Sequence, residues 1–270
     1  MNRPEFFTPL SFDFLWEAMA LGEPPYPLEV ASHGATEAER RLLRQRADNE
    51  LRARGIRDSG GRLDPGVEDW LTLLARPALS IDAVHIPELH ARPVAALAAS
   101  DGRNGVLAVQ DADGIWIRSV YPEGLASAVV DLLPAVGRGT EASVTLPVDE
   151  AVRIAPLRTP VTAPAGSAGG GGRRTGLADR QTDPRQAYAQ LTGQTRIRGG
   201  QLAANSRSPL GGKRRSPVLG WFDTSTGRYL SLAKSGPDRR EWVTVSPADT
   251  KTLRTRLGEL LAEIGDQGRP

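Results

Sequence analysis

The residue types that most often do chemistry are scarce in this chain and poorly spaced for it. Its three histidines are His33, His85 and His90. Pro87 separates His85 from His90, so these two share neither a helix face nor a simple strand register. A structural zinc site has four ligands at recognisable spacings, and the chain has no cysteine to complete such a set. We therefore expect no metal site.

Motifs for nucleophilic catalysis or phosphate binding are also missing. The sequence has no Gly-Xaa-Ser-Xaa-Gly elbow. Gly169–Gly172, followed by two arginines, resembles a phosphate-binding loop, but it lacks both the Gly-Lys-Ser/Thr ending and a preceding strand. No acid–base pair or cofactor loop emerges elsewhere. We expect no catalytic residue and no cofactor, and we expect that the chain is not an enzyme.

One basic segment could bind a partner. It carries four cations within nine residues: Arg207, Lys213, Arg214 and Arg215. A predicted hairpin places them near the aromatic pair 221–222, as in a nucleic-acid-binding surface. Against this hypothesis, Asp223 follows at once, the formal net charge is only +2, and no nucleic-acid motif is present. A solvated turn, a protein contact and nucleic-acid binding by the hairpin 207–215 all stay open.

Charge is divided unevenly along the chain. Residues 1–150 carry 14 arginines, no lysine and 23 acids, a balance of −9, whereas residues 151–270 carry 20 bases and 9 acids, a balance of +11. Such a dipole orients a charged partner over about 8 Å at physiological salt, or it simply draws the two halves together. Arginine outnumbers lysine 31 to 3, which is typical of a high-GC genome.

The N-terminal residues and the hydropathy of the chain indicate where it works. Residues 1–10 contain Glu5 and two prolines but no apolar run, so we expect no signal peptide. No stretch approaches the roughly 18 uninterrupted apolar residues of a membrane span. We expect a cytoplasmic protein.

A pattern that occurs twice predicts how these residues are positioned. Residues 106–118 read Val-Leu, an aspartate, a turn ending in glycine and an alternating strand, and residues 218–232 repeat this with an offset of 112. An Asp-Pro pair, which is typical of a helix start, precedes each copy at 64–65 and at 183–184. We infer one sheet protein with two similar halves.

Periodicity and capping residues predict the individual elements. Helices are expected at 10–19, 37–54, 65–75, 122–133, 148–154, 184–192 and from 247 to 264. Strands are expected at 78–86, 94–99, 105–111, 115–120, 195–206, 217–232 (a hairpin) and 241–245. The Pro-, Gly- and Arg-rich segment 155–182 is expected to be a flexible linker. It would join residues 1–154 and 183–266 as halves of a single domain.

Several short motifs, in order, resemble one known family. In the first half they are Tyr-Pro-Leu-Glu-Val at 26–30, His-Gly-Ala-Thr at 33–36, Leu-Arg-Ala-Arg-Gly at 51–55 and Leu-Leu-Ala-Arg-Pro at 73–77. In the second half they are Gly-Gln-Leu at 200–202, the basic run 213–215, Gly-Arg-Tyr-Leu at 227–230 and Val-Thr-Val-Ser-Pro-Ala-Asp at 243–249. Together they resemble the EspG family of type VII (ESX) secretion-associated proteins, with features of a non-mycobacterial, actinobacterial member.

The resemblance implies a fold and a function. The implied fold is an α/β (α+β type) arrangement with quasi-twofold symmetry, in which a central, mainly antiparallel β-sheet is flanked by two helical bundles. The implied function is that of a cytosolic chaperone, which binds the exposed tip of a secreted PPE-like or PE–PPE-like helical heterodimer and selects it for secretion. A homodimer through exposed sheet edges is an alternative assembly without the client.

The resemblance also implies a partner-facing surface. It would comprise the sheet at 200–206 and 218–222 and the C-terminal helix at 247–264. Many relatives have an aromatic residue after Gln201, whereas this chain continues Leu-Ala-Ala-Asn, which indicates a changed client. The residues expected to contact it are Gln201, Leu202, Arg214, Arg215, Val218, Trp221, Leu253, Arg254 and Leu257.

Overall fold

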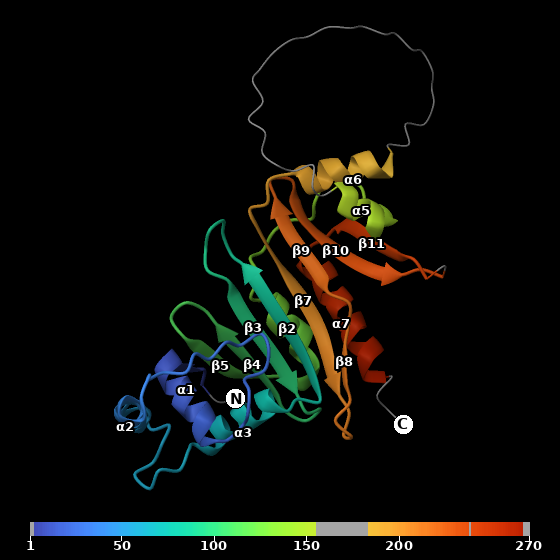
Figure 1. Cartoon of the computed structure of the whole chain (residues 1–270). Helices are drawn as coiled ribbons and strands as arrows, with labels where there is room; N and C mark the ends of the chain where they lie inside the picture. Colours follow the sequence, from blue (N-terminus) through green and yellow to red (C-terminus); the bar gives the residue numbers. More distant parts are fainter. Residues whose placement is uncertain (1–2, 155–182, 238, 267–270) are drawn as a thin grey trace, which may run out of the picture.

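An eleven-stranded β-sheet runs through the whole molecule (Figure 1). A computed structural model of the chain describes residues 3–154, 183–237 and 239–266. The strand order is β1-β5-β4-β3-β2-β7-β9-β10-β11-β6, and β8 pairs with β7 outside this path. Every pair of neighbouring strands is antiparallel. The fold is therefore the expected α/β type with a central antiparallel sheet.

The sheet contains eleven strands, eight of which lie in segments where the sequence predicts strands. The first six are β1 (Glu5–Phe7), β2 (Leu79–Ile86), β3 (Val94–Ser100), β4 (Gly105–Gln110), β5 (Ile115–Val120) and β6 (Val144–Pro147). The other five are β7 (Arg198–Arg207), β8 (Lys213–Arg215), β9 (Leu219–Thr224), β10 (Gly227–Ser235) and β11 (Glu241–Pro247).

The helices begin at the capping residues that the sequence indicates. Asp64 accepts the backbone N–H groups of Gly66 and Val67, and Asp183 accepts that of Arg185. The helices are α1 (Pro9–Ala18), α2 (Glu37–Ala53), α3 (Pro65–Ala75), α4 (Leu125–Val130), α5 (Val148–Ile154), α6 (Pro184–Gly193) and α7 (Thr250–Asp266). One 3₁₀ turn, η1 (Pro122–Gly124), precedes α4.

Two halves of the chain repeat one plan around the centre of the sheet. The first half runs α3, β2, β3, β4, β5, α4, and the second runs α6, β7, β9, β10, β11, α7. The antiparallel pair β2–β7 joins them, so the order of strands is the same on either side of this pair. One sheet with two similar halves is therefore confirmed.

The offset of 112 residues is wrong as a guide to equivalent strands. It aligns the β4–β5 hairpin with β9–β10, whereas β4–β5 occupies the place of β10–β11 in the sheet. The shared pattern is one of β-hairpins in general, because two apolar strands around an Asp and Gly turn recur in any antiparallel sheet. Spatial equivalence depends instead on the distant pairing of β2 with β7.

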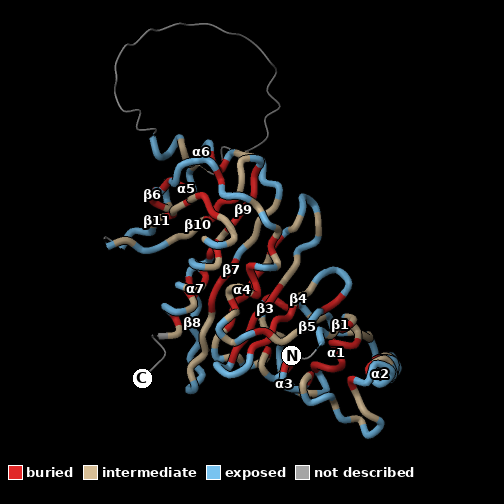
Figure 2. Tube along the Cα trace, turned by 180° about the vertical axis from the view of Figure 1, so that it is seen from behind, coloured by how far each residue is buried: buried red, intermediate tan, exposed pale blue. Residues whose placement is uncertain are grey.

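One face of the sheet is covered by α4 and α7 across its centre (Figure 2). Alternate side chains of β2, β7 and β9 join the two helices there in an apolar core. On the opposite face, α1 and α3 cover the end near β5 with a second core, and α2 packs on α1. A third core lies under α5 and α6 at the end near β11. The helices of this face therefore stand at opposite ends of the sheet.

Some predicted elements differ from the structure. The helix expected at 122–133 is shorter and begins with the turn η1, and three short strands, β1, β6 and β8, were not predicted. Strand β6 and helix α5 precede residue 155 but pack beside β11, at the end of the sheet that belongs to the second half. The predicted linker 155–182 lies outside the described residues. None of the described helices is long and apolar enough to cross a membrane.

Candidate partner-binding groove

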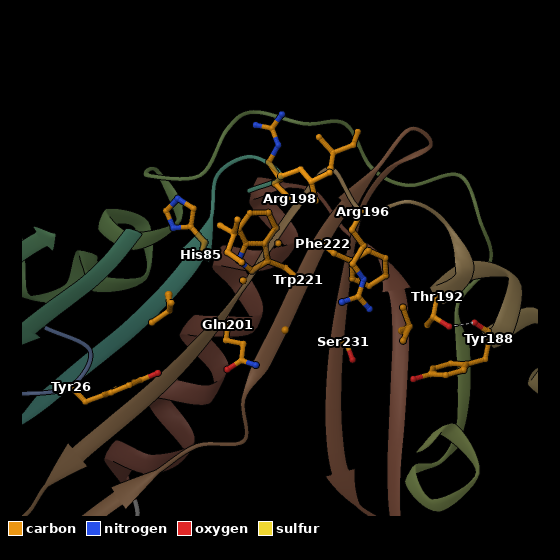
Figure 3. Close-up of a pocket in the computed structure, with 18 residues that line it drawn as sticks. Tyr26, His85, Tyr188, Thr192, Arg196, Arg198, Gln201, Trp221, Phe222 and Ser231 are labelled. Atoms are coloured by element: carbon orange, nitrogen blue, oxygen red, sulfur yellow. Dashed lines mark hydrogen bonds between the residues drawn. The ribbon is translucent and has the colours of Figure 1, made fainter. Parts of the chain in front are cut away.

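A groove lies where the face opposite α4 and α7 is left open between the two groups of helices. Its volume is about 600 Å³, and its floor is formed by the strands β2, β7, β9 and β10 (Figure 3). The floor residues Gln201, Gly220 and Ser231 are polar or small. We call this feature the central groove.

Two glycines in the strands under the central groove, Gly200 and Gly220, lack side chains for different reasons. A Cβ atom on Gly200 would lie 2.5 Å from the carbonyl oxygen of Val84, so the close approach of β2 and β7 requires glycine there. A Cβ atom on Gly220 would meet only Ser231, at an ordinary 3.6 Å. The space above Gly220 is therefore open groove, whereas the space beside Gly200 is filled by the neighbouring strand.

The rim of the central groove exposes large apolar side chains. Leu89 is 67% exposed, Tyr26 is 61%, Ile86 is 45% and Ile197 is 43%. They come from three separate segments, namely the proline-rich loop after α1, the end of β2 with its following loop, and the approach to β7. Val218, 41% exposed, lies two residues before Gly220. Convergence of exposed apolar residues on a single hollow is a feature of protein-interaction sites.

A cation stands at the end of the central groove where the chain leaves α6. Arg196 lies over the ring of Phe222, 4.7 Å from its centroid. Arg198, whose side chain is one quarter exposed, instead lies beside Asp223 on the helix-covered face of the sheet. Tyr188 and Thr192 of α6 complete this wall (Figure 3). Among the described residues that line the groove, none is aspartate or glutamate.

A hydrogen-bonded network borders the central groove at the level of Tyr26. Asp82, which is 3% exposed, accepts two hydrogen bonds from the guanidinium of Arg215, at 2.6 and 2.9 Å, and one from the amide of Asn205. Arg215 in turn lies 5.5 Å from the ring centroid of Tyr26. The bidentate pair therefore ties β8 to β2 across β7 and helps to place Tyr26.

A buried ion pair supports the cationic end from the other face of the sheet. Asp223 and Arg228 are 2% and 0% exposed, and the carboxylate accepts bonds of 2.7 and 2.9 Å from Arg228. Arg198 Nε lies 3.5 Å from the same carboxylate. Burial, and next the charge of Arg228, lowers the pKa of His85. His85 is therefore uncharged at neutral pH, and the cationic character comes from the arginines.

The comparisons with known proteins identify the family. A family model described as the EspG family matches residues 8–259. The chain belongs to the EspG family. A search of curated proteins found no match.

A solved structure shares the fold of this EspG-family chain. It is the Mycobacterium tuberculosis type VII secretion system chaperone EspG5 in complex with the PE25–PPE41 dimer. The match covers 99% of each chain with a TM-score of 0.70, at 14% sequence identity. The likeness is therefore one of fold.

Four of the nine predicted contact residues are buried in this EspG-family chain. They belong to the core under α4 and α7 and are at most 2% exposed: Leu202, Trp221, Leu253 and Leu257. They point away from the open face, so they are not available to a partner while the fold is intact. Gln201, the neighbour of Leu202, points into the central groove instead.

The other predicted residues do not form one surface. Val218 lies beside the central groove, and Arg214 and Arg215 lie on β8 next to it. Arg254 lies on α7, against the opposite face, and donates a 2.7 Å bond to Asp131. Residues that the sequence analysis missed, above all Tyr26, Ile86 and Leu89, come from the first half of the chain. The signal that could have identified them is an apolar side chain in a loop or at the end of a strand, where it is not needed for the core.

The aromatic pair 221–222 does not supply the stacking surface that nucleic-acid binding by the basic hairpin was expected to use. Trp221 and Phe222 are 2% and 4% exposed, so neither ring can stack on a base. Arg215 is held by Asp82. Among the described residues, no group of three or more His, Cys, Asp or Glu side chains could hold a metal ion.

Proposed function

We propose that this chain is a cytoplasmic chaperone of a type VII (ESX) secretion system, which binds the apolar tip of a PPE-like helical hairpin protein. The client is a PPE-like protein or a PE–PPE-like heterodimer, and in both cases the chaperone keeps the client soluble and targets it for secretion. The observation that carries the proposal is the central groove with its exposed apolar rim, in a member of the EspG family.

The physical reason for such a chaperone is the solubility of the client. A helical hairpin that ends in apolar side chains aggregates unless these are covered. A specific complex buries roughly 1,200 to 2,000 Å² in total, which an open sheet face with an adjoining helix can provide. Because the client has to be handed over, we expect a dissociation constant between about 1 μM and 1 nM.

The proposed contact surface is the central groove and its borders. Gln201 and Val218 stay in this surface, with Arg214 and Arg215 at its edge, and Tyr26, Ile86 and Leu89 are added to it. Arg254 and the four buried residues Leu202, Trp221, Leu253 and Leu257 are not part of the proposed surface. The role is one of binding, and we assign no catalytic residue.

Co-expression with candidate clients tests the proposal. The chain is produced with each PE–PPE-type pair of its own genome, and complexes are identified by size-exclusion chromatography and mass spectrometry. We expect one pair or a few to co-elute in stoichiometric amounts. Leu89→Glu should abolish co-elution, whereas Leu42→Glu should not, because Leu42 is equally exposed, at 68%, but lies on α2. Absence of any complex with the wild-type chain would overturn the proposal.

A further inference from the structure

Tyr26 is the most exposed aromatic side chain among the described residues that line the central groove, at 61%. Its loop is held at two points. The indole of Trp16 donates a 2.8 Å hydrogen bond to the carbonyl of Gly22, before Tyr26. After it, the backbone of Glu29 and the side-chain amide of Gln110 exchange two hydrogen bonds, of 2.8 and 2.6 Å. The backbone on either side of Tyr26 is therefore fixed, whereas its ring extends beyond the loop (Figure 3).

Arg215 of β8 holds the ring of Tyr26. Its guanidinium carbon lies 5.5 Å from the ring centroid, within the range in which an aromatic face attracts a cation. Strand β8 has only three residues, all of them exposed, and it pairs with β7 outside the main strand order. Because its backbone fixes so little of the long arginine side chain, Arg215 needs a partner of its own to keep its place beside Tyr26.

Asp82 of β2 supplies that partner. Its buried carboxylate accepts hydrogen bonds of 2.6 and 2.9 Å from Arg215, and the amide oxygen of Asn205 accepts a third, at 3.1 Å. Asp82 is itself fixed because its strand is paired on both sides, with Leu97 and Ala203 as its direct neighbours. A bidentate pair of this kind sets the orientation of the guanidinium as well as its position. The central sheet therefore determines the place of Arg215 through Asp82.

We propose that Asp82 is a positioning residue for client binding, which acts through Arg215 to hold the ring of Tyr26 in the orientation that the client contacts. This inference rests on the proposed chaperone function and adds a residue that is too deeply buried for the client to touch. An aromatic side chain that is ordered before binding loses less conformational freedom when the client docks. Tyr26 also borders both the central groove and a second pocket beside β8, of about 340 Å³, so its orientation affects the shape of both hollows.

A double-mutant cycle tests the inference. The probe is the PE–PPE-type pair that co-elutes with the wild-type chain, and its affinity is measured by calorimetry. Tyr26→Ala should weaken binding about tenfold or more. Asp82→Asn, which removes the charge that holds Arg215, should weaken it about fivefold. In a chain that already carries Tyr26→Ala, Asp82→Asn should cause no further loss, because its effect passes through the ring. Equal losses from Asp82→Asn in both backgrounds would overturn the inference.

Arg215→Gln serves as a second variant because it breaks the same link from the border of the sheet and leaves the paired strand β2 unchanged. It should lower the affinity only in a chain that retains Tyr26. A loss of the same size in the Tyr26→Ala chain would show that Arg215 contacts the client directly, and would overturn the positioning role of Asp82.

Asp149→Asn is the matched control. Asp149 accepts hydrogen bonds from Arg240, whose guanidinium carbon lies 5.8 Å from the ring centroid of Trp242. The same arrangement of acid, arginine and aromatic ring is therefore loosened at β11, outside the residues that line the central groove. Asp149→Asn should leave the affinity unchanged, and a loss equal to that of Asp82→Asn would overturn the inference.

The orientation of Tyr26 is measurable without any client, which separates this inference from the function on which it rests. Fluorotyrosine replaces the four tyrosines of the chain, and Tyr26→Phe assigns the Tyr26 resonance in the fluorine NMR spectrum. Asp82→Asn should move this resonance towards its position in the unfolded chain, whereas Asp149→Asn should not. If a pair binds the wild-type chain but the resonance stays in place, the inference is overturned and the chaperone function stands. If no pair binds at all, both are overturned.

Discussion

The two faces of strand β7 show how one segment serves both stability and binding. Leu202 is 1% exposed and packs under α4 and α7, whereas its neighbour Gln201 is exposed on the floor of the central groove. Both residues belong to the same hydrogen-bonded ladder with β2. Because side chains alternate along a strand, one face can be closed by helices while the other stays open. The helices of the open face gather at its ends, and the space between them is the groove.

The buried ion pair of the closed face should show the largest effect of a single substitution. Asp223→Asn would leave Arg228 buried without its anionic partner, and breaking a buried pair in this way costs about 3 to 5 kcal/mol. Urea denaturation of the purified chain measures the loss. Asp111→Asn is the matched control because Asp111 precedes the β4–β5 turn in the same sequence pattern but is exposed. We expect Asp111→Asn to change the free energy of unfolding by about 0.5 kcal/mol. An equal loss in both variants would contradict the claim that Asp223 forms a buried ion pair with Arg228.

The neighbours Leu202 and Gln201 test the contrast between the faces directly. Leu202→Ala opens a cavity in the core and should lower the free energy of unfolding by about 2 to 5 kcal/mol. Gln201→Ala should change it by no more than about 0.5 kcal/mol. Client affinity, measured by calorimetry, should respond to Gln201→Ala even though stability does not. A large loss of stability at Gln201 would mean that the groove floor is part of the core.

Protonation of His85 at acid pH should lower the free energy of unfolding slightly. This is the smallest of the expected effects on stability. The folded state lowers the pKa of His85, so the unfolded state binds more protons as the pH falls through about 6.5. The contribution of His85 to stability is therefore full above this pH and is lost as the pH falls. Thermal unfolding between pH 7.5 and 5.5 should show a shallower decline for His85→Gln than for the wild-type chain. If the melting temperatures of the two proteins declined in parallel, burial and the charge of Arg228 would not lower the pKa of His85.

The sequence predicts the helices and strands of this fold better than it predicts which strands of the two halves occupy equivalent places in the sheet. Capping residues and periodicity locate the seven helices of the described chain and eight of its strands. The unpredicted β8 reads Lys-Arg-Arg, which has no alternation, and β6 is recognisable only through its pairing with β11, about 100 residues away. The repeat offset was wrong because hairpin turns resemble one another locally, whereas the position of a hairpin in the sheet depends on the distant pair β2–β7.

The candidate site was harder to predict than the fold. Apolar residues with strand or helix periodicity, such as Trp221 and Leu257, are buried in the core and are therefore unavailable to a partner. The apolar residues at the groove rim, such as Tyr26 and Leu89, lie in loops without any period. Their convergence follows from the arrangement of the sheet and its helices, which no local pattern contains.

The central claim is that the client occupies the open face, and filling the groove tests it most directly. Gly220→Val would place a side chain above the groove floor, where a Cβ meets only Ser231 at 3.6 Å. Gly258→Val is the matched control, because Gly258 lies on α7 against the closed face and a Cβ there has no neighbour within 4 Å. The measurement is the affinity of both variants for the client that co-elutes with the wild-type chain. The groove account predicts a loss of about tenfold or more for Gly220→Val and none for Gly258→Val, and the reverse result would place the client on the helical face.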